Sequence, residues 1–266
     1  MDAVLLFSGQ GAQKVGMGKD LYDQYPVAKA LIEQADKALG ESLSAVMFEG
    51  PGEELTRTCN CQPALYVHGL ACLAVLKELV PSLNPVAAAG LSLGEFTAHA
   101  AAGTYSFEEG LRLVQKRGAF MEEACNATKG TMAAMIGGTD ENVIKLAQEC
   151  DVDVANFNCP GQTVVSGTEE GVAKAVAGAK AAGCKIAKKL NVAGAYHSRL
   201  MHSAMVKLAE ELKNISFGTP SMPVYCNYEA RVVEGPDDIR SMLEHQVCGS
   251  VRWTASMQKL VDQGHR

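Results

Sequence analysis

The segment from Gly90 to Gly94 has the residue types of a serine nucleophile on a tight turn. It reads Gly90-Leu91-Ser92-Leu93-Gly94, a G-x-S-x-G pattern between a short apolar segment and a helical pattern. In such a strand-to-helix turn the glycines prevent clashes, and the serine hydroxyl is exposed in a strained conformation. The pattern is common by chance and also fits a glycine-rich turn with an incidental serine. Its predicted strand-helix context favours the nucleophile.

A serine hydroxyl is a weak nucleophile until a base takes its proton, and histidine is the usual base. The available histidines are His68, His99, His197, His202, His245 and His265. His99 follows Ser92 on the same predicted helix, too far along it to reach back, and the apolar pattern around His68 indicates packing. His197 lies where a predicted insertion returns to the main domain. It is the leading candidate, but spacing alone does not decide between the histidines.

A second unusual segment, Ser8-Gly9-Gln10-Gly11-Ala12-Gln13, follows the first predicted strand. Its glycines suit a backbone nest that donates amides to an oxygen atom. A phosphate-binding loop is the competing interpretation. The segment lacks G-K-[ST], and Lys14 stands where the third glycine of G-x-G-x-x-G would be, so this interpretation is not supported.

Two groups of elements must position these residues. Residues 1–127 and 198–266 are predicted to form a large α/β-hydrolase-like domain with a mainly parallel sheet. Its expected strands are 3–7 and 85–90, and its expected helices are 27–39, 63–79, 93–101 and 107–125. Pro63 is expected in the first turn of its helix, and Ser106 is expected as an N-cap.

Residues 128–197 are predicted to form a smaller, inserted subdomain. The expected strands are 131–136, 152–157, 163–165 and 184–190, and the expected helices are 141–150 and 169–181. The order β-α-β-β-α-β is typical of a ferredoxin-like fold. An active-site cleft is expected between the subdomain and the large domain.

Composition excludes several classes of protein. Of the 266 residues, 47% are hydrophobic and 20% are charged, as in ordinary globular proteins. The net charge of −6 gives no reason to expect nucleic-acid binding, and no uninterrupted apolar run approaches a membrane span of about 18 residues. No signal peptide is expected at the N-terminus, so the nine cysteines are expected to be reduced in the cytoplasm. The one-residue spacing of Cys59 and Cys61, with His68 downstream, does not fit a zinc site, and no metal is expected.

Four motifs together point to a family. They are Gly9-Gln10-Gly11-x-Gln13, Gly90-x-Ser92-x-Gly94-Glu95, Lys116-Arg117-Gly118 and Tyr196-His197-Ser198. In this order and at these distances they resemble the malonyl-CoA:acyl carrier protein transacylases and the acyltransferase domains of polyketide synthases. The resemblance covers nearly the whole chain and implies the same two-part α/β fold.

The resemblance implies a role for each matching catalytic position. Ser92 would be acylated, and His197 would act as its general base and then as the acid for the leaving thiol. The backbone amides of Gln10 and Leu93 would form the oxyanion hole. The main-chain oxygen of Gln246 would orient the histidine, so no acidic triad member is required.

The resemblance also implies a substrate. Arg117 would bind the malonyl carboxylate, although a solvated charge on its helix is the alternative interpretation of this residue. Gln62, Leu91 and Tyr196 would line the pocket; Leu91 stands where the family usually has histidine, and Tyr196 where malonyl-selective members commonly have phenylalanine. Coenzyme A thioester would be a substrate, no cofactor would be tightly bound, and a monomer would act with acyl carrier protein in fatty acid or polyketide synthesis. Family members continue beyond the position of Arg266 with a further strand and a glycine-proline turn.

Two other functions remain open from the sequence. A serine esterase or thioesterase shares the G-x-S-x-G turn and commonly has an acid between serine and histidine in chain order. Asp151 and Asp153 occupy that interval, within the predicted insertion. A non-catalytic module that docks a carrier protein is the second alternative, which the presence of Ser92, Arg117 and His197 disfavours.

Overall fold

The computed structural model describes residues 1–265, so Arg266, the last residue of the predicted large domain, lies outside the described residues. The chain divides into two compact units. The first contains residues 1–119, 211–225 and 232–239, and the second contains residues 120–210, 226–231 and those from Arg240 onward. The second unit is thus larger than the predicted insertion, and the boundaries of residues 128–197 remain a prediction.

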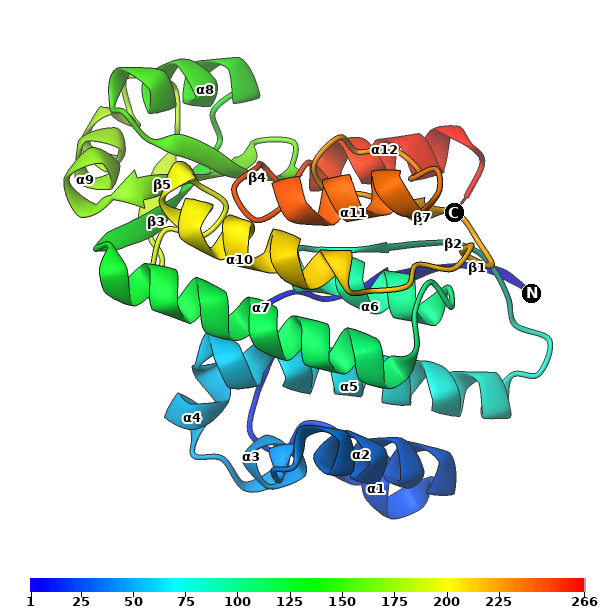
Figure 1. Ribbon diagram of the computed structural model, residues 1–266. Helices are drawn as coiled ribbons and strands as arrows, with labels where there is room; N and C mark the ends of the chain where they lie inside the picture. Colours follow the sequence, from blue (N-terminus) through cyan, green and yellow to red (C-terminus); the bar gives the residue numbers. More distant parts are fainter. Residues whose placement is uncertain (266) are drawn as a thin grey trace. The chain divides into compact units, whose positions relative to one another are not determined.

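A three-stranded parallel sheet forms the centre of the first unit, which confirms the expected mainly parallel arrangement. Its strand order is β1 (Asp2–Phe7), β2 (Asn84–Gly90) and β7 (Val224–Tyr225). Figure 1 shows β1 and β2 running side by side. The register pairs Phe7 with Gly90, so the loops that follow the two strands begin at the same edge of the sheet. Polar groups placed on both loops therefore lie near one another.

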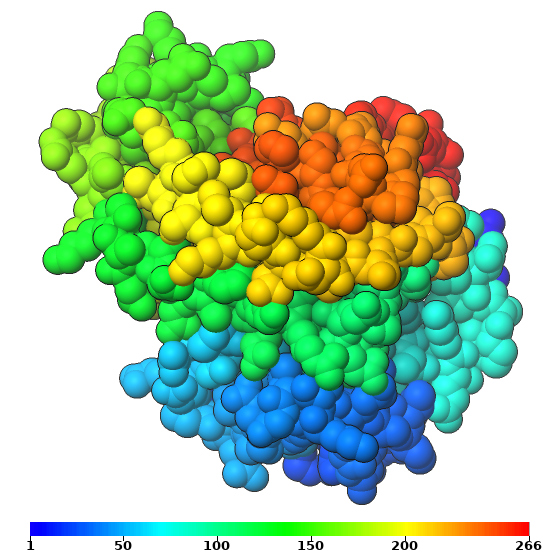
Figure 2. All heavy atoms as spheres, viewed as in Figure 1, coloured from blue at the N-terminus to red at the C-terminus, as the bar shows by residue number. Residues whose placement is uncertain are grey.

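Helices that lie wholly within the first unit contribute much of its buried hydrophobic core. They are α1 (Lys19–Gln24), α2 (Pro26–Leu39), α3 (Leu43–Glu49), α4 (Gly52–Thr56), α5 (Thr58–Leu79) and α6 (Leu93–Ala101). In the space-filling view the blue atoms of the N-terminal helices form one continuous surface (Figure 2). The predicted bounds of α6 are confirmed, because the strand ends at Gly90 and the helix begins directly after Ser92.

Helix α5 differs from the prediction at its N-terminus. It begins at Thr58, so Pro63 lies inside the helix rather than in its first turn, and the expectation for Pro63 was wrong. Burial explains the difference: Gln62, Pro63 and the four residues that follow are all buried, and packing outweighs the hydrogen bond that proline cannot donate. By length and composition α5 is also apolar enough to cross a membrane. Most of this apolar stretch is buried within the protein, which is typical of a core helix.

Helix α7 (Phe107–Ala127) begins in the first unit and ends in the second. Its start is a capping box, because the Glu109 amide donates to Ser106 Oγ at 3.2 Å and the Ser106 amide donates to the Glu109 carboxylate at 3.1 Å. The predicted N-cap is confirmed. This cap fixes where the helix starts and hence which face of it carries Arg117.

The second unit contains a four-stranded antiparallel sheet in the order β4-β5-β3-β6. Its elements in chain order are β3 (Gly130–Ile136), α8 (Asp140–Glu149), β4 (Asp153–Cys159), β5 (Gln162–Thr168), α9 (Glu169–Gly178) and β6 (Ile186–Lys189). The predicted β-α-β-β-α-β order is confirmed, and aliphatic side chains such as Val143, Val165 and Val172 form its core.

Three further helices and a short 3-10 turn complete the chain. They are η1 (Arg199–Met201), α10 (His202–Lys213), α11 (Pro236–His245) and α12 (Trp253–Asp262). The edge of β4 is covered where Asn156 bridges Val251, just before α12. The segment between α11 and α12 is thereby attached to the antiparallel sheet of its own unit.

Candidate active site

Ser92 stands on a strained turn between β2 and α6. Its φ is 54° and its ψ is −106°, a conformation that costs energy for any residue with a side chain. The turn is too tight for other side chains: a Cβ at Gly90 would lie 1.9 Å from the carbonyl carbon of Gly94, and one at Gly94 would lie 2.3 Å from the Phe7 oxygen. The predicted strand-helix geometry of the G-x-S-x-G motif is confirmed.

Arg117 from α7 contacts the Ser92 side chain directly. Its Nη2 donates to Ser92 Oγ at 3.2 Å, and its Nη1 donates to Gln62 Oε1 at 2.6 Å. The side chain is only 1% exposed, and its guanidinium carbon lies 5.0 Å from the centre of the Phe96 ring. The alternative interpretation of Arg117 as a solvated helix charge is therefore wrong. A cation held beside the serine suits a substrate that carries an anionic group close to its reacting carbon.

Close helix packing explains why Arg117 reaches the serine. A Cβ at Gly118 would lie 2.4 Å from the carbonyl oxygen of Thr58, at the start of α5. Glycine at this position lets α7 approach α5 closely, and Gln62 is on the second turn of α5. Phe96 follows Ser92 by one helical turn and places its ring at the same guanidinium. Sequence reasoning missed Phe96, although its spacing from Ser92 on a predicted helix was a usable signal.

The loop after β1 packs against the Ser92 turn. A Cβ at Gly9 would lie 2.4 Å from the Leu91 carbonyl oxygen. The main-chain N–H of Leu91 donates to the carbonyl oxygen of Phe7 at 3.0 Å. Leu93 is the first residue of α6, so its amide is one of the donors that a helix leaves without an internal acceptor. The sheet edge thus brings the loop that carries Gln10 beside the turn that carries Leu91 and Leu93.

His197 belongs to the second unit and occupies a similarly strained turn, with a φ of 54°. It is 4% exposed, and its Nδ1 is 2.8 Å from the carbonyl oxygen of Gln246. A carbonyl can only accept, so Nδ1 carries the proton and Nε2 presents its lone pair. This is the tautomer that a general base requires.

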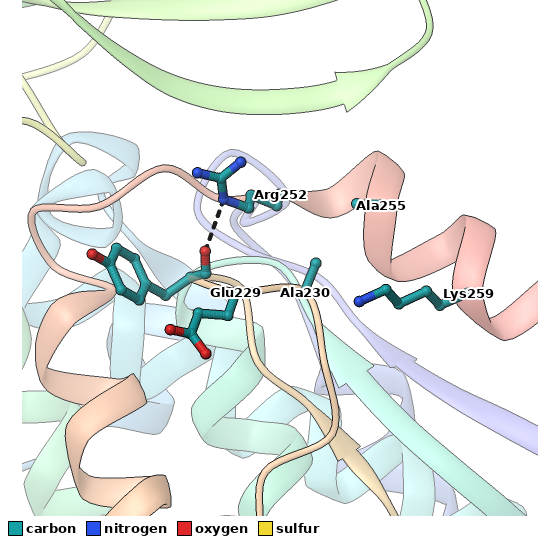
Figure 3. Close-up of a pocket in the computed structure, with 6 residues that line it drawn as sticks. Glu229, Ala230, Arg252, Ala255 and Lys259 are labelled. Carbon is teal, nitrogen blue, oxygen red and sulfur yellow. Dashed lines mark hydrogen bonds between the residues drawn. The ribbon is translucent and has the colours of Figure 1, made fainter.

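The carbonyl that orients His197 is itself held in place. Gln246 is buried just after α11, and its main-chain N–H donates to the carbonyl oxygen of Met242 at 3.0 Å. Further along, Arg252 Nε donates to the Tyr228 carbonyl at 2.9 Å (Figure 3). A Cβ at Gly249 would lie 2.3 Å from the Tyr228 ring, so the segment packs closely on that ring. The surface pocket in Figure 3 contains none of the predicted site residues.

Other titratable groups in the described chain have different surroundings. His99 is fully buried, which lowers its pKa to about 3, and its Nδ1 is 3.2 Å from Thr104 Oγ1. The Arg199 side chain donates to both Asp151 and Asp153. Its Nη1 lies 2.8 Å from Asp151 Oδ1, and its Nε lies 3.1 Å from Asp153 Oδ2. Neither aspartate takes the place of Gln246 at His197 Nδ1. The arrangement expected for an acid-containing esterase triad is not the one that orients this histidine.

Tyr196 precedes the histidine and is 7% exposed. The turn that carries it packs on Cys125, a residue that sequence reasoning did not single out, because a Cβ at Gly194 would lie 2.2 Å from Cys125 Sγ. Nothing in the local sequence indicates this contact, because α7 and the 194–198 turn are far apart along the chain.

Among residues 1–265, no group of three or more His, Cys, Asp or Glu side chains is arranged to hold a metal ion.

The predicted site residues form two groups, each inside one unit. Ser92, Arg117 and Gln62 are joined by hydrogen bonds in the first unit, and His197 and Gln246 are joined in the second. A strained serine with an adjacent buried cation, and a histidine that bonds a carbonyl through one ring nitrogen, are residue types that serine-dependent acyl transfer uses. A family model described as an acyl transferase domain matches residues 4–266, and the chain belongs to this family of acyltransferases.

Three relatives illustrate the similarity. The malonyl CoA-acyl carrier protein transacylase of Bacillus subtilis is 43% identical over 264 residues, which are 97% of this chain and 83% of the relative. The solved structure of the transacylase from Coxiella burnetii has a TM-score of 0.95 at 35% identity and covers 98% of this chain and 84% of its own. A malonyl-transacylase solved in complex with a type II polyketide synthase acyl-carrier protein has a TM-score of 0.94 at 36% identity, covering 98% and 86%. The resemblance expected from the four motifs is confirmed.

Proposed function

We propose that this acyltransferase moves a malonyl group from coenzyme A to the phosphopantetheine thiol of acyl carrier protein, through an ester on Ser92. The observation that carries the proposal is the contact of the buried Arg117 guanidinium with Ser92 Oγ. A guanidinium fork binds both oxygens of a carboxylate, and malonyl has a carboxylate one carbon away from its thioester carbonyl. The names of the relatives agree with this substrate and partner.

In the first half-reaction, His197 Nε2 takes the Ser92 proton as Oγ attacks the thioester carbonyl carbon. The oxyanion accepts from the amides of Gln10 and Leu93, and the partial positive charge at the start of α6 adds to this stabilisation. The carbon–sulfur bond then breaks, and the proton on His197 passes to the sulfur of coenzyme A. The malonyl group remains as an ester on Ser92.

The second half-reaction reverses these steps with a different thiol. His197 takes the proton of the phosphopantetheine thiol, whose sulfur attacks the malonyl-serine carbonyl. The ester bond breaks, and the proton returns to Ser92 Oγ. Because Nδ1 is held by the Gln246 carbonyl, His197 can cycle between neutral and protonated forms without changing its orientation.

Gln62 orients Arg117 through the hydrogen bond to Nη1. Leu91 and Tyr196 are proposed to line the acyl pocket, where an aromatic ring favours malonyl over branched units. The reaction needs no tightly bound cofactor or metal, and we place a monomeric enzyme in the cytoplasm, in fatty acid or polyketide synthesis. The nine free cysteines of the described chain fit a reducing compartment. Hydrolysis is the second candidate, but the hydrogen bonds of Asp151 and Asp153 to Arg199 give it less support.

Intact-protein mass spectrometry tests the proposal. Wild-type protein mixed with malonyl-CoA is expected to gain the mass of one malonyl group, and Ser92→Ala is expected to gain none. Ser82→Ala, which changes an exposed serine away from the turn, is the matched control and should still be acylated. Retention of the adduct by Ser92→Ala would refute the role of Ser92. Transfer to water rather than to carrier-protein thiol would favour a thioesterase.

A further inference from the structure

Phe96 places an aromatic ring against the buried cation of the site. It lies one helical turn after Ser92 on α6 and is fully buried. The guanidinium carbon of Arg117 lies over its ring, 5.0 Å from the ring centre, and both residues belong to the first unit. The face of an aromatic ring is negative and attracts a cation within about 6 Å of the ring centre. The Phe96 ring is therefore close enough to attract the charge of Arg117.

This attraction leaves the donors of the guanidinium available for other partners. Arg117 Nη1 donates to Gln62 Oε1 at 2.6 Å, and Nη2 donates to Ser92 Oγ at 3.2 Å. A bond to a substrate carboxylate would use N–H groups in the same way, and a guanidinium has five of them. The contact with the Phe96 ring acts on the charge as a whole. It can thus orient Arg117 without competing with a carboxylate for hydrogen bonds.

The ring is attached to a well-fixed part of the chain. The Tyr105 hydroxyl donates to the carbonyl oxygen of Phe96 at 2.7 Å, and Tyr105 is itself buried, so water competes little for this bond. Ser92 is the N-cap residue of the same helix, four positions before Phe96. The nucleophile and the ring that attracts the cation therefore belong to one short segment, and the ring places the charge relative to Ser92.

Burial decides how much this contact contributes. Arg117 is 1% exposed and Phe96 is 0% exposed, so neither the charge nor the ring face is shielded by bulk water. A contact between a cation and a ring is several times stronger at a desolvated site than at an exposed one. The contribution of the Phe96 ring should therefore be large enough to appear in a rate constant.

We propose that Phe96 is a positioning residue that increases the preference for malonyl, because its ring holds the Arg117 guanidinium where the malonyl carboxylate can bind it. The inference rests on the proposed function, in which Ser92 is acylated and Arg117 binds the carboxylate. Phe96 acts through Arg117 and not on the reacting atoms. An acyl group without a carboxylate, such as acetyl, gains little from this contact.

Fluorinated phenylalanines separate this role from ordinary core packing. Fluorine atoms withdraw electrons from the ring face, which weakens its attraction for a cation, while the ring keeps nearly the same size. Phe107 provides a matched control on α7 in the same unit, because its ring stacks on the Tyr66 ring, 5.8 Å between centres, rather than on a cation. A general effect of fluorine on a packed ring should appear at both positions.

Stopped-flow acylation of Ser92 by malonyl-CoA and by acetyl-CoA tests the proposal. Phenylalanines with one, two and three fluorine atoms are introduced at position 96 by amber-codon suppression. Each added fluorine is expected to lower the second-order rate constant for malonyl, about tenfold over the series, and to change that for acetyl less than about twofold. The same series at position 107 should leave both rate constants unchanged. An unchanged malonyl rate over the Phe96 series, or equal losses for the two substrates, would overturn the proposal.

A double-mutant cycle tests whether Phe96 acts through Arg117. Phe96→Leu should lower the ratio of malonyl to acetyl acylation about tenfold, and it should cost malonyl acylation nothing further in an Arg117→Ala background. Effects that multiply in the double variant would contradict the proposal. Circular dichroism melts show whether Phe96→Leu is folded, and the fluorinated series still gives the answer if it is not. A wild-type protein that forms no malonyl-serine would instead refute the proposed function.

Discussion

His99 should make the protein lose stability in mild acid. The imidazole is fully buried on α6, and its Nε2 has no hydrogen-bond partner among the described residues. Burial lowers the pKa of His99 from the ordinary 6.5 to about 3, because the charged imidazolium would lose its hydration. The folded protein therefore keeps His99 neutral, whereas the unfolded chain takes up a proton as the pH falls below 6.5.

The sign and size follow from proton linkage. Below pH 6.5 the unfolded state binds more protons than the folded state, so stability falls with falling pH until about pH 3. At pH 5, one and a half units below the unfolded value, the loss from this one histidine is about 2 kcal/mol. The size of this loss hardly changes with the pKa of His99 in the folded protein, as long as that pKa lies well below 5. Above pH 7.5 the contribution is complete.

Urea unfolding from pH 8 to pH 5, followed by circular dichroism, measures this effect in wild type and His99→Asn. Asparagine keeps a polar atom that can reach Thr104 but does not titrate in this range. Whatever the substitution costs at pH 8, the loss of stability between pH 8 and pH 5 should be smaller than in wild type by about 2 kcal/mol. His202→Asn, at an exposed histidine, controls for the general effect of losing an imidazole. Parallel pH profiles for wild type and His99→Asn would refute the reasoning.

Two further predictions concern the serine and its neighbours. Arg117→Ala should slow acylation by malonyl-CoA about 1,000-fold in stopped-flow assays, because a buried carboxylate would lose its charged partner. Acylation by acetyl-CoA, which has no carboxylate, should slow less than about tenfold. Equal losses for the two substrates would show that Arg117 does not bind the carboxylate. Gly90→Ala should abolish acylation or unfold the protein, because the new methyl group would lie 1.9 Å from the Gly94 backbone. Gly52→Ala, whose Cβ would meet nothing closer than 3.9 Å, is the control in melting and acylation assays, and equal behaviour of the two glycine variants would contradict this packing argument.

Local features of this fold could be predicted from sequence because neighbouring residues determine them. The Ser106–Glu109 capping box and the strand-helix junction at Ser92 depend on residues within a few positions of each other. The start of α5 could not be predicted in this way. Pro63 is a local signal for a helix start, but the buried residues around it extend the helix back to Thr58.

The site residues show the same division. Ser92 and its glycines follow from spacing, whereas the residues alone left His197 one of several histidines until the resemblance of four motifs singled it out. Its Nδ1 bonds the main-chain oxygen of Gln246, 49 residues away. Every residue type has such an oxygen, so the sequence does not indicate which residue provides it. The contact between Gly194 and Cys125 joins segments that share no local pattern, so only the structure reveals it.

Glycine has a comparable purpose in both parts of the proposed site. At Gly118 the missing side chain lets α7 approach the start of α5, and this approach brings Arg117 to Gln62 and Ser92. At Gly194 the missing side chain lets the histidine turn rest on Cys125. In each unit the polar contacts of the site depend on a backbone approach that any larger residue would prevent. Each of these contacts joins residues of one unit: Arg117 bonds Gln62 and Ser92, and His197 bonds the Gln246 carbonyl.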